Sequence, residues 1–198
     1  SGYQGRATYS FPTLSDAFEA CRLAIRHDAT PAVLRLYDPI ESARSHGGDG
    51  EETIVLVLDE GHQRIVDATL ATVDEFFVKC GGSVVEHDRV EHWLEHRNDT
   101  TALQGLTKKG FVIDTMEVTV SWSKLDAVYR AVRDAALSTP HAVSASAHLS
   151  HSYLDGACLY FSLASRPPRD TPLPEIDAIH RTLWDESQRA ALRTGANL

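Results

Sequence analysis

Side chains that can take or give a proton are concentrated in one stretch of the chain, residues 147–161, with the sequence AHLSHSYLDGACLYF. Its Asp155-Gly156 pair is typical of a two-residue type I′ turn, because both central positions of that turn need positive φ. A turn at this place predicts a hairpin in which His151 lies directly opposite Tyr160.

The predicted hairpin sorts its side chains onto two faces, because alternate residues of a strand point to opposite sides of a sheet. The face expected in the core comprises Leu154, Leu159, Phe161 and Leu163. The face expected to be open comprises His151, Tyr153, Cys158 and Tyr160. Rigid strands can hold such groups in a geometry suited to proton transfer. The alternative is a polar sheet face that another layer simply covers.

Arg35 lies in the middle of a predicted strand and is a candidate for binding an anion. A guanidinium group keeps its charge in proteins, so one that faces inward must find an anion or several carbonyl oxygens. The alternative is an arginine on an edge strand that pairs with Asp38 or Glu41.

The sequence His92-Trp-Leu-Glu-His96 matches the H-x-x-E-H pattern of inverzincin metallopeptidases, in which two histidines one helical turn apart bind zinc. The pattern is short, the spacing identifies no third ligand, and the neighbouring Glu95 and Arg97 fit an ordinary amphipathic helix equally well. We therefore expect no metal site, with both histidines exposed around a buried Trp93.

The chain has 198 residues, 42% of them hydrophobic, which is enough to bury a substantial core. Its formal net charge is -9 at pH 7 and its basic residues are scattered, which argues against nucleic acid as a partner. No apolar run approaches the roughly 20 residues that span a bilayer, so we expect a cytoplasmic protein. The three cysteines, Cys21, Cys80 and Cys158, are far apart and fit buried apolar residues better than disulfides or a metal site.

Hydrophobic periodicity and turn residues predict an α+β fold, an antiparallel sheet with helices mostly on one face, built from two ferredoxin-like halves. The halves are residues 1–89 and 107–198 of a single domain, 1–198, and a helical segment at 90–106 joins them. Strands are predicted at 7–11, 32–37, 53–58, 83–85 and 111–120 and in the hairpin, and helices at 14–27, 63–79, 122–137 and 174–193. Residues 41–51, with three glycines, are expected to form a mobile loop.

Four motifs follow one another along the chain: PAVLRLYD at 31–38, WLEHR at 93–97, DTME at 114–117 with Trp122 after it, and SHSYLDGACLYF at 150–161. In this order they resemble the C-terminal cap domain of FAD-linked oxidases of the vanillyl-alcohol oxidase type. The likeness is strongest to the alkyldihydroxyacetonephosphate synthases and their bacterial relatives, and it covers nearly the whole chain.

The resemblance implies that a separate N-terminal domain holds FAD while this domain closes over the flavin ring. The family's catalytic tyrosine falls on Tyr160, and its two substrate-site arginines fall on Arg35 and Arg97. The expected partner is a small substrate that carries a phosphate or a carboxylate. The expected catalytic residues are Tyr160 and His151, and the expected substrate-binding residues are Arg35, Arg97, Tyr153 and His148.

The implied reaction is the exchange of an acyl for an alkyl group on a dihydroxyacetone phosphate ester through a flavin adduct. The alternative is an FAD-dependent oxidase or dehydrogenase of 2-hydroxy acids, and a stand-alone binding module is a further one. A lipid substrate would bring the protein into peripheral contact with a membrane.

The family's histidine run normally follows a glycine-rich approach such as residues 194–198, where this chain ends, and the FAD-binding domain is missing. We therefore expect a domain excised from a longer flavoenzyme. Alone it should be folded but inactive, and it should retain neither flavin nor zinc.

Overall fold

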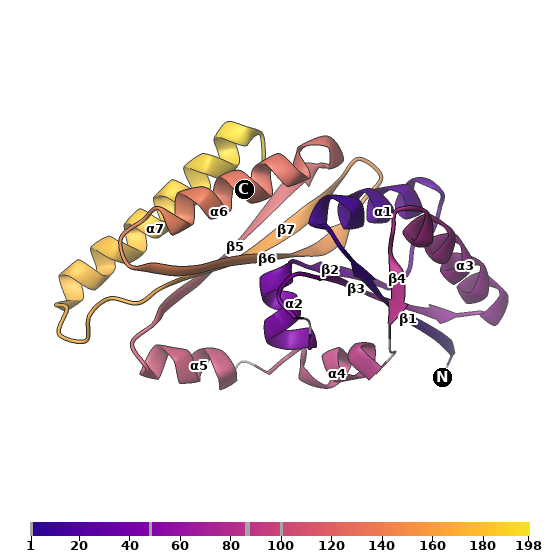
Figure 1. The fold of residues 1–198 in the computed structure, drawn as a ribbon, viewed down its shortest axis with the longest axis horizontal. Helices are drawn as coiled ribbons and strands as arrows, with labels where there is room; N and C mark the ends of the chain where they lie inside the picture. Colours follow the sequence, from indigo (N-terminus) through magenta and orange to yellow (C-terminus); the bar gives the residue numbers. More distant parts are fainter. Residues whose placement is uncertain (1, 48, 86–87, 100) are drawn as a thin grey trace. The chain divides into compact units, whose positions relative to one another are not determined.

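The computed structural model describes residues 2–47, 49–85, 88–99 and 101–198. In this part of the chain the fold is α+β, with seven α-helices and seven strands in an antiparallel sheet of order β4-β1-β3-β2-β6-β7-β5 (Figure 1). Two compact units divide the chain. Unit 1 comprises Ser1–Arg97 and His148–Cys158, and unit 2 comprises Asn98–Ala147 and Leu159–Leu198.

Unit 1 is built on four strands from the first half of the chain and the end of a fifth. The strands are β1 (Tyr3–Phe11), β2 (Val33–Tyr37), β3 (Thr53–Gly61), β4 (Ser83–Val85) and the last residues of β6 (Ala142–Ser152). The helices are α1 (Leu14–Arg26), α2 (Pro39–His46), α3 (Gln63–Lys79) and α4 (Asp88–His96). β2 pairs with β3 on one side and with β6 on the other, where Tyr37 lies opposite His148. β2 is therefore an inner strand.

Aromatic side chains pack α3 against one face of this sheet. The ring of Phe77 meets the rings of Tyr9 and Phe11 edge to face, with centroids 4.8 and 5.4 Å apart. All three side chains are buried. Each fully buried apolar side chain of this size contributes about 1.5–3 kcal/mol, so this cluster is a major part of the core of unit 1.

The opposite face of the sheet carries α4. Val90, which is buried, and the half-buried Trp93 and Leu94 pack on Leu56 and Leu58 of β3. The amphipathic spacing of α4 accounts for this, since residues three and four apart share one side of a helix. The prediction that helices lie mostly on one face is therefore wrong for unit 1, where α3 and α4 lie on opposite faces of the same strands.

The segment predicted as a mobile loop, residues 41–51, begins instead with α2. Asp38 caps this helix, since its carboxylate accepts a hydrogen bond from the Glu41 N–H at 2.8 Å. Pro39 occupies the first turn, and Gly47 ends the helix with φ 68°, a left-handed conformation that glycine adopts without strain. The Ser42 hydroxyl donates to a β2 carbonyl at 2.9 Å and anchors the helix to the sheet.

Unit 2 contains α5 (Thr101–Lys108), β5 (Val112–Ser121), α6 (Leu125–Leu137), most of β6, most of β7 (Gly156–Ser165) and α7 (Leu173–Thr194). Its core confirms part of the predicted hairpin pattern, because Leu159, Phe161 and Leu163 are all buried. The ring of Tyr129 on α6 stacks on that of Phe161 at 6.4 Å. The helical segment predicted at 90–106 is found as α4 and α5. The ferredoxin-like description of the two halves stays a prediction.

The turn of the hairpin differs from the prediction. The Tyr153 N–H donates to the Gly156 carbonyl at 2.8 Å, which closes the turn around Leu154 and Asp155, one residue earlier than expected. Neither Asp155 nor Gly156 has a positive φ, so the turn is not type I′. Leu154, predicted to be in the core, is 59% exposed. The pairing of His151 with Tyr160 was derived from that turn and loses its basis.

No helix in the described part of the chain is long and apolar enough to cross a membrane.

Candidate anion-binding site

Arg35 is held on an inner strand of unit 1, on the face that α4 covers. In the β2–β3 register it lies opposite Leu56, which packs against that helix. Its guanidinium carbon lies 5.5 Å from the centre of the Trp93 ring and 5.9 Å from that of Tyr37. The aromatic faces stabilise the cation, and a side-chain hydrogen bond links Arg35 to Tyr37.

A histidine and a buried glutamate hold one end of this guanidinium. Arg35 Nη2 lies 2.6 Å from His148 Nε2, and His148 Nδ1 lies 2.9 Å from Glu41 Oε2. Glu41 also pairs with Arg44 at 3.2 Å. The alternative of an edge-strand arginine is wrong, because β2 lies between two strands, and in these contacts Arg35 reaches Glu41 through His148. Asp38 serves as the cap of α2.

Three buried nitrogen atoms of this region have no hydrogen-bond partner among the described residues: Arg35 Nε, His46 Nδ1 and Arg89 Nη1. Arg35 and Arg89 lie near enough to His46 for their charges to act on its pKa. Buried polar groups are normally paired, because an unpaired one costs about 1–3 kcal/mol. Unpaired nitrogens beside two fixed positive charges are the arrangement that an anion would complete.

Burial sets the protonation of the aromatic groups in the site. Desolvation lowers the pKa of His46 to about 4, against the opposing charge of Glu41, so His46 is neutral near pH 7. Desolvation also raises the pKa of Tyr37 to about 12, an effect that the charge of Arg35 opposes. The site is therefore positive through its arginines rather than its histidine.

Arg97, the second predicted arginine, comes to the same tryptophan. Its guanidinium carbon lies 5.4 Å from the centre of the Trp93 ring, which Arg35 contacts at 5.5 Å. Both arginines therefore lie against one aromatic ring. Their role in holding one anion stays a proposal.

The H-x-x-E-H histidines pair with each other instead of forming a wider cluster. The rings of His92 and His96 lie 4.2 Å apart, and His96 Nδ1 contacts the His92 carbonyl at 2.8 Å. In the described residues no group of three or more histidine, cysteine or carboxylate side chains could hold a metal ion. Trp93, expected to be buried, is half-buried beneath the two arginines.

The hairpin residues are divided between the units. His151 is exposed and Tyr153 is 54% exposed, both in unit 1, whereas Tyr160 is half-buried in unit 2. Cys158, expected on the open face, is buried. The catalytic roles of His151 and Tyr160 and the contact of Tyr153 with substrate therefore stay predictions.

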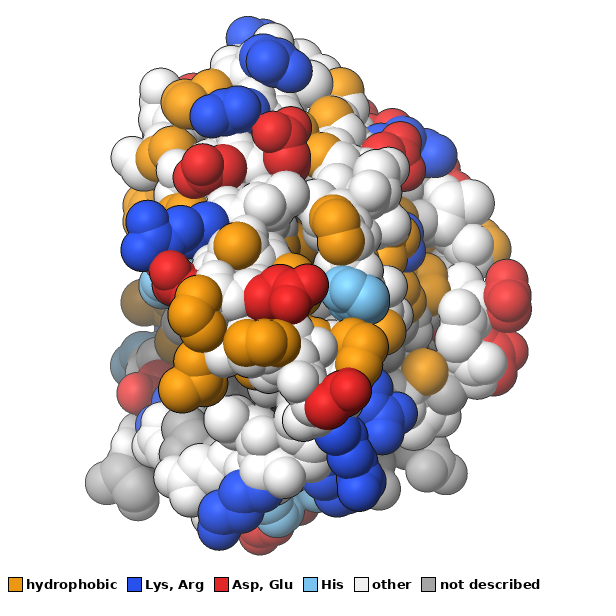
Figure 2. Space-filling model, turned by 90° about the vertical axis from the view of Figure 1, so that its left-hand side faces the viewer, with side chains coloured by type: hydrophobic (Ala, Val, Ile, Leu, Met, Phe, Trp, Pro, Cys, Tyr) orange, Lys and Arg blue, Asp and Glu red, His pale blue; other side chains and the backbone are white. Residues whose placement is uncertain are grey.

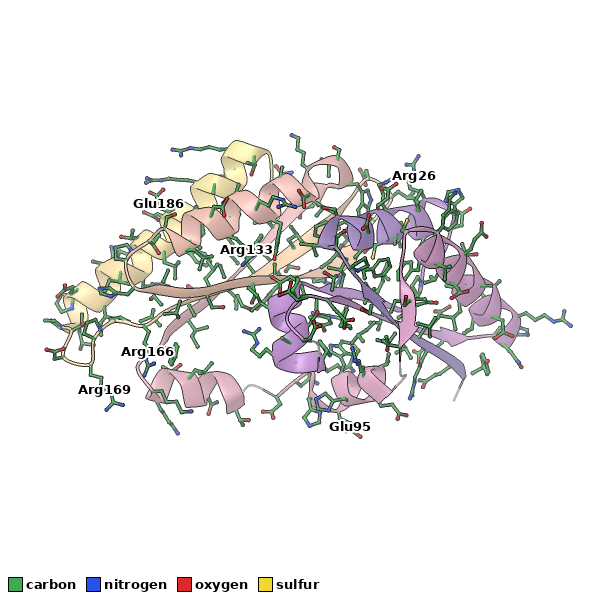
Figure 3. All side chains as sticks on the ribbon, in the orientation of Figure 1. Arg26, Glu95, Arg133, Arg166, Arg169 and Glu186 are labelled. Atoms are coloured by element: carbon green, nitrogen blue, oxygen red, sulfur yellow. The ribbon has the colours of Figure 1, made fainter. Side chains whose placement is uncertain are left out.

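Unit 2 has polar pairs of its own. His180 Nε2 on α7 lies 2.6 Å from Asp114 Oδ2 in the DTME motif. Arg133, labelled in Figure 3, donates to the Ala145 carbonyl at 2.8 Å and lies over the Tyr129 ring. These contacts tie α6 and α7 to their strands.

Sequence reasoning missed two members of the candidate site, namely His46 and Arg89, and named Glu41 only as a direct partner of Arg35. A local signal existed for the helix that carries Glu41 and His46, because Asp38-Pro39 is typical of a capped helix start and Gly47 of a helix end. Arg89 precedes the apolar Val90 of α4, and only the fold brings it to His46.

The face of the molecule drawn in Figure 2 does not suggest a polyanion as partner. On the face drawn in Figure 2, Lys and Arg side chains alternate with Asp and Glu and with apolar groups. A phosphate backbone is instead bound by a continuous basic stripe.

The family described as "FAD linked oxidases, C-terminal domain" matches residues 3–195. The chain belongs to this family. An uncharacterized FAD-linked oxidoreductase of Escherichia coli O157:H7, YgcU, is 26% identical over 204 residues, which cover 96% of this chain and 42% of that protein. The alkyldihydroxyacetonephosphate synthase of Dictyostelium discoideum is 24% identical over 208 residues, which cover 89% of this chain and 34% of that protein.

Several solved structures have the same fold as this chain. An alkyldihydroxyacetonephosphate synthase superposes with a TM-score of 0.81 at 21% identity, over 99% of this chain and 40% of that one. The 4-ethylphenol oxidase of Gulosibacter chungangensis superposes with a TM-score of 0.64 at 13% identity, over 97% of this chain and 45% of that one. The chain thus spans less than half the length of these relatives.

Proposed function

We propose that this chain is the substrate-binding domain of an FAD-linked enzyme and that Arg35 binds the anionic group of its substrate. The observation that carries the proposal is the buried, unpartnered Nε of Arg35, with His46 Nδ1 and Arg89 Nη1 likewise unpartnered among the described residues. Family membership supplies the link to FAD. When bound, the flavin would supply the electron-accepting chemistry, and this domain would bind and orient the substrate.

The two arginines would have different roles, because Arg35 is partly buried and Arg97 is exposed. Arg35 is partly buried and braced by His148, so it suits a fixed contact with one anionic group. Arg97 is exposed on the same tryptophan and suits capture of an incoming anion. Tyr160 would move a proton at its hydroxyl, with His151 assisting, and Tyr153 would touch the substrate from the hairpin.

A phosphate ester suits this site better than a single carboxylate. The unpartnered N–H groups of Arg35 and Arg89 call for acceptor oxygens, and a phosphate monoester has three terminal ones and up to two negative charges. This favours a reaction like that of alkyldihydroxyacetonephosphate synthase, which two of the relatives are named for. A 2-hydroxy acid carries only one negative charge to set against the two arginines.

Titration of the 198-residue chain with inorganic phosphate and, separately, with glycolate tests the proposal. Amide shifts in an NMR spectrum should saturate around β2 and α4, with phosphate the tighter of the two. Arg35→Gln should weaken phosphate binding by about 10-fold or more. Arg22→Gln, which removes the same charge from a surface pair with Glu19 on α1, is the matched control and should change little. Equal binding by the two variants would refute the Arg35 site.

A further inference from the structure

We propose that Glu41 is a positioning residue that acts through His148 to fix the guanidinium group of Arg35. The consequence for ligand binding rests on the function proposed above. The arrangement of the three side chains stands on the distances alone, and it gives a buried carboxylate a part in anion binding.

The direction of each hydrogen bond follows from what the groups can do. An arginine side chain only donates, so Nη2 of Arg35 donates to His148 Nε2 at 2.6 Å. His148 Nε2 must then be without a proton, and the ring carries its proton on Nδ1. That N–H donates to the Glu41 carboxylate at 2.9 Å. Glu41 thus selects one tautomer of His148, and only that tautomer can accept from Arg35.

The three side chains Glu41, His148 and Arg35, called the relay below, all lie on regular secondary structure. Glu41 is 4% exposed and lies in the first turn of α2, where the helix N-terminus favours a negative charge. His148 lies in β6, directly opposite Tyr37 of β2. Because the three residues come from a helix and two paired strands, the guanidinium is braced before any ligand arrives.

Loss of Glu41 would free the His148 ring to change its tautomer. With the proton on Nε2, the ring would present an N–H to the N–H of Arg35 Nη2, which is a repulsive contact. The guanidinium would then become mobile, and the entropy lost when a ligand orders it would weaken binding.

This role predicts an effect opposite in sign to that of charge alone. A carboxylate near an anion site repels the anion, so its removal should strengthen anion binding if nothing else changes. If Glu41 positions Arg35 through His148, its removal should weaken binding unless the replacement still accepts the His148 N–H. The two substitutions Glu41→Leu and Glu41→Gln separate these effects, since both remove the charge and only glutamine keeps an acceptor.

The experiment combines phosphate titration with NMR of ¹⁵N-labelled histidine, which reports which ring nitrogen carries the proton. In the unaltered chain His148 should carry it on Nδ1. Glu41→Leu should lose that preference and bind phosphate about 10-fold or more weakly, whereas Glu41→Gln should keep the tautomer and bind at least as tightly as the unaltered chain. Glu95→Gln, on the exposed side of α4 (Figure 3), is the control for removal of a carboxylate and should leave the tautomer unchanged.

Two results would overturn the relay: a proton on Nε2 of His148 in the unaltered chain, or phosphate binding by Glu41→Leu as tight as that of Glu41→Gln. The first applies even if Glu41→Leu does not fold. If the unaltered chain binds no phosphate, the proposed anion site fails, and the relay is then judged by the tautomer and by whether the Arg35 Nε–H signal broadens in Glu41→Leu.

Discussion

The rings of Tyr37 and His46 contact one another at an angle of 48° with their centroids 4.1 Å apart, and this contact brings the end of α2 onto β2. His46 is 7% exposed, and its burial lowers its pKa to about 4. Only the neutral imidazole can be buried here without a large desolvation penalty.

Acid should destabilise the protein through His46. Its pKa in the folded state lies below the value of about 6.5 expected in the unfolded state, so the unfolded chain binds the extra proton as the pH falls from 6.5 to 4. The free energy of unfolding is therefore highest above pH 6.5 and falls by about 3 kcal/mol as the pH is lowered to 4 and below. In His46→Phe, which keeps a ring on Tyr37, urea unfolding at a series of pH values should show a smaller loss than in the unaltered chain. Parallel pH profiles would contradict the assignment.

Removal of the Phe77 ring should be among the most costly substitutions in unit 1. Phe77→Ala empties a buried position between Tyr9 and Phe11, and we expect the free energy of unfolding to fall by about 3–5 kcal/mol. Ile65→Ala on the same helix, where the side chain is 66% exposed, should cost less than about 1 kcal/mol. Denaturant unfolding measures both, and similar costs would argue against the packing of α3.

Two glycine substitutions should have opposite effects on stability. A Cβ at Gly82 would lie 2.6 Å from the Phe11 ring and 2.9 Å from the Phe77 carbonyl oxygen, so Gly82→Ala should cost about 1–3 kcal/mol. A Cβ at Gly105, inside α5, would meet none of the described atoms within 4 Å. Gly105→Ala should raise stability by up to about 1 kcal/mol, because alanine favours a helix. A thermal melt of each variant decides the sign.

The proton-transfer role of Tyr160 is testable in an FAD-loaded form of the enzyme. Tyr160→Phe keeps the half-buried ring and deletes only the hydroxyl. We expect unchanged FAD content and a turnover lower by about 10²-fold, the usual contribution of a positioned acid or base. Tyr153→Phe, on the exposed part of the hairpin, is the comparison and should lose less. Turnover near that of the unaltered enzyme would reduce Tyr160 to a packing residue.

Alternation in the sequence predicted the buried face of β7 correctly, even though the turn before it was placed wrongly. Leu159, Phe161 and Leu163 are apolar at every second position, and this pattern selects a face whatever the turn does. The Asp155-Gly156 pair suggested positive φ, but Gly156 starts the strand in a conformation that any residue can adopt. A turn motif is a local preference, and the strand pairing overrides it.

The site was only half visible in the sequence for a similar reason. Arg35 and His148 lie in predicted strands, and a charged residue in an apolar strand attracts notice. Glu41 and His46 belong to a short helix that three nearby glycines concealed, although its cap and its C-terminal glycine were both present. Arg89 joins the site through the packing of α4, which no local pattern reports.

The bond between Arg35 and His148 joins residues 113 positions apart in the chain. A ribosome adding about 5–20 residues per second needs roughly 6 to 20 s to make the segment between them. During that time Arg35 and Glu41 have been synthesised but lack the ring that links them. Arg35 therefore cannot make its bond to His148 until β6 has been synthesised.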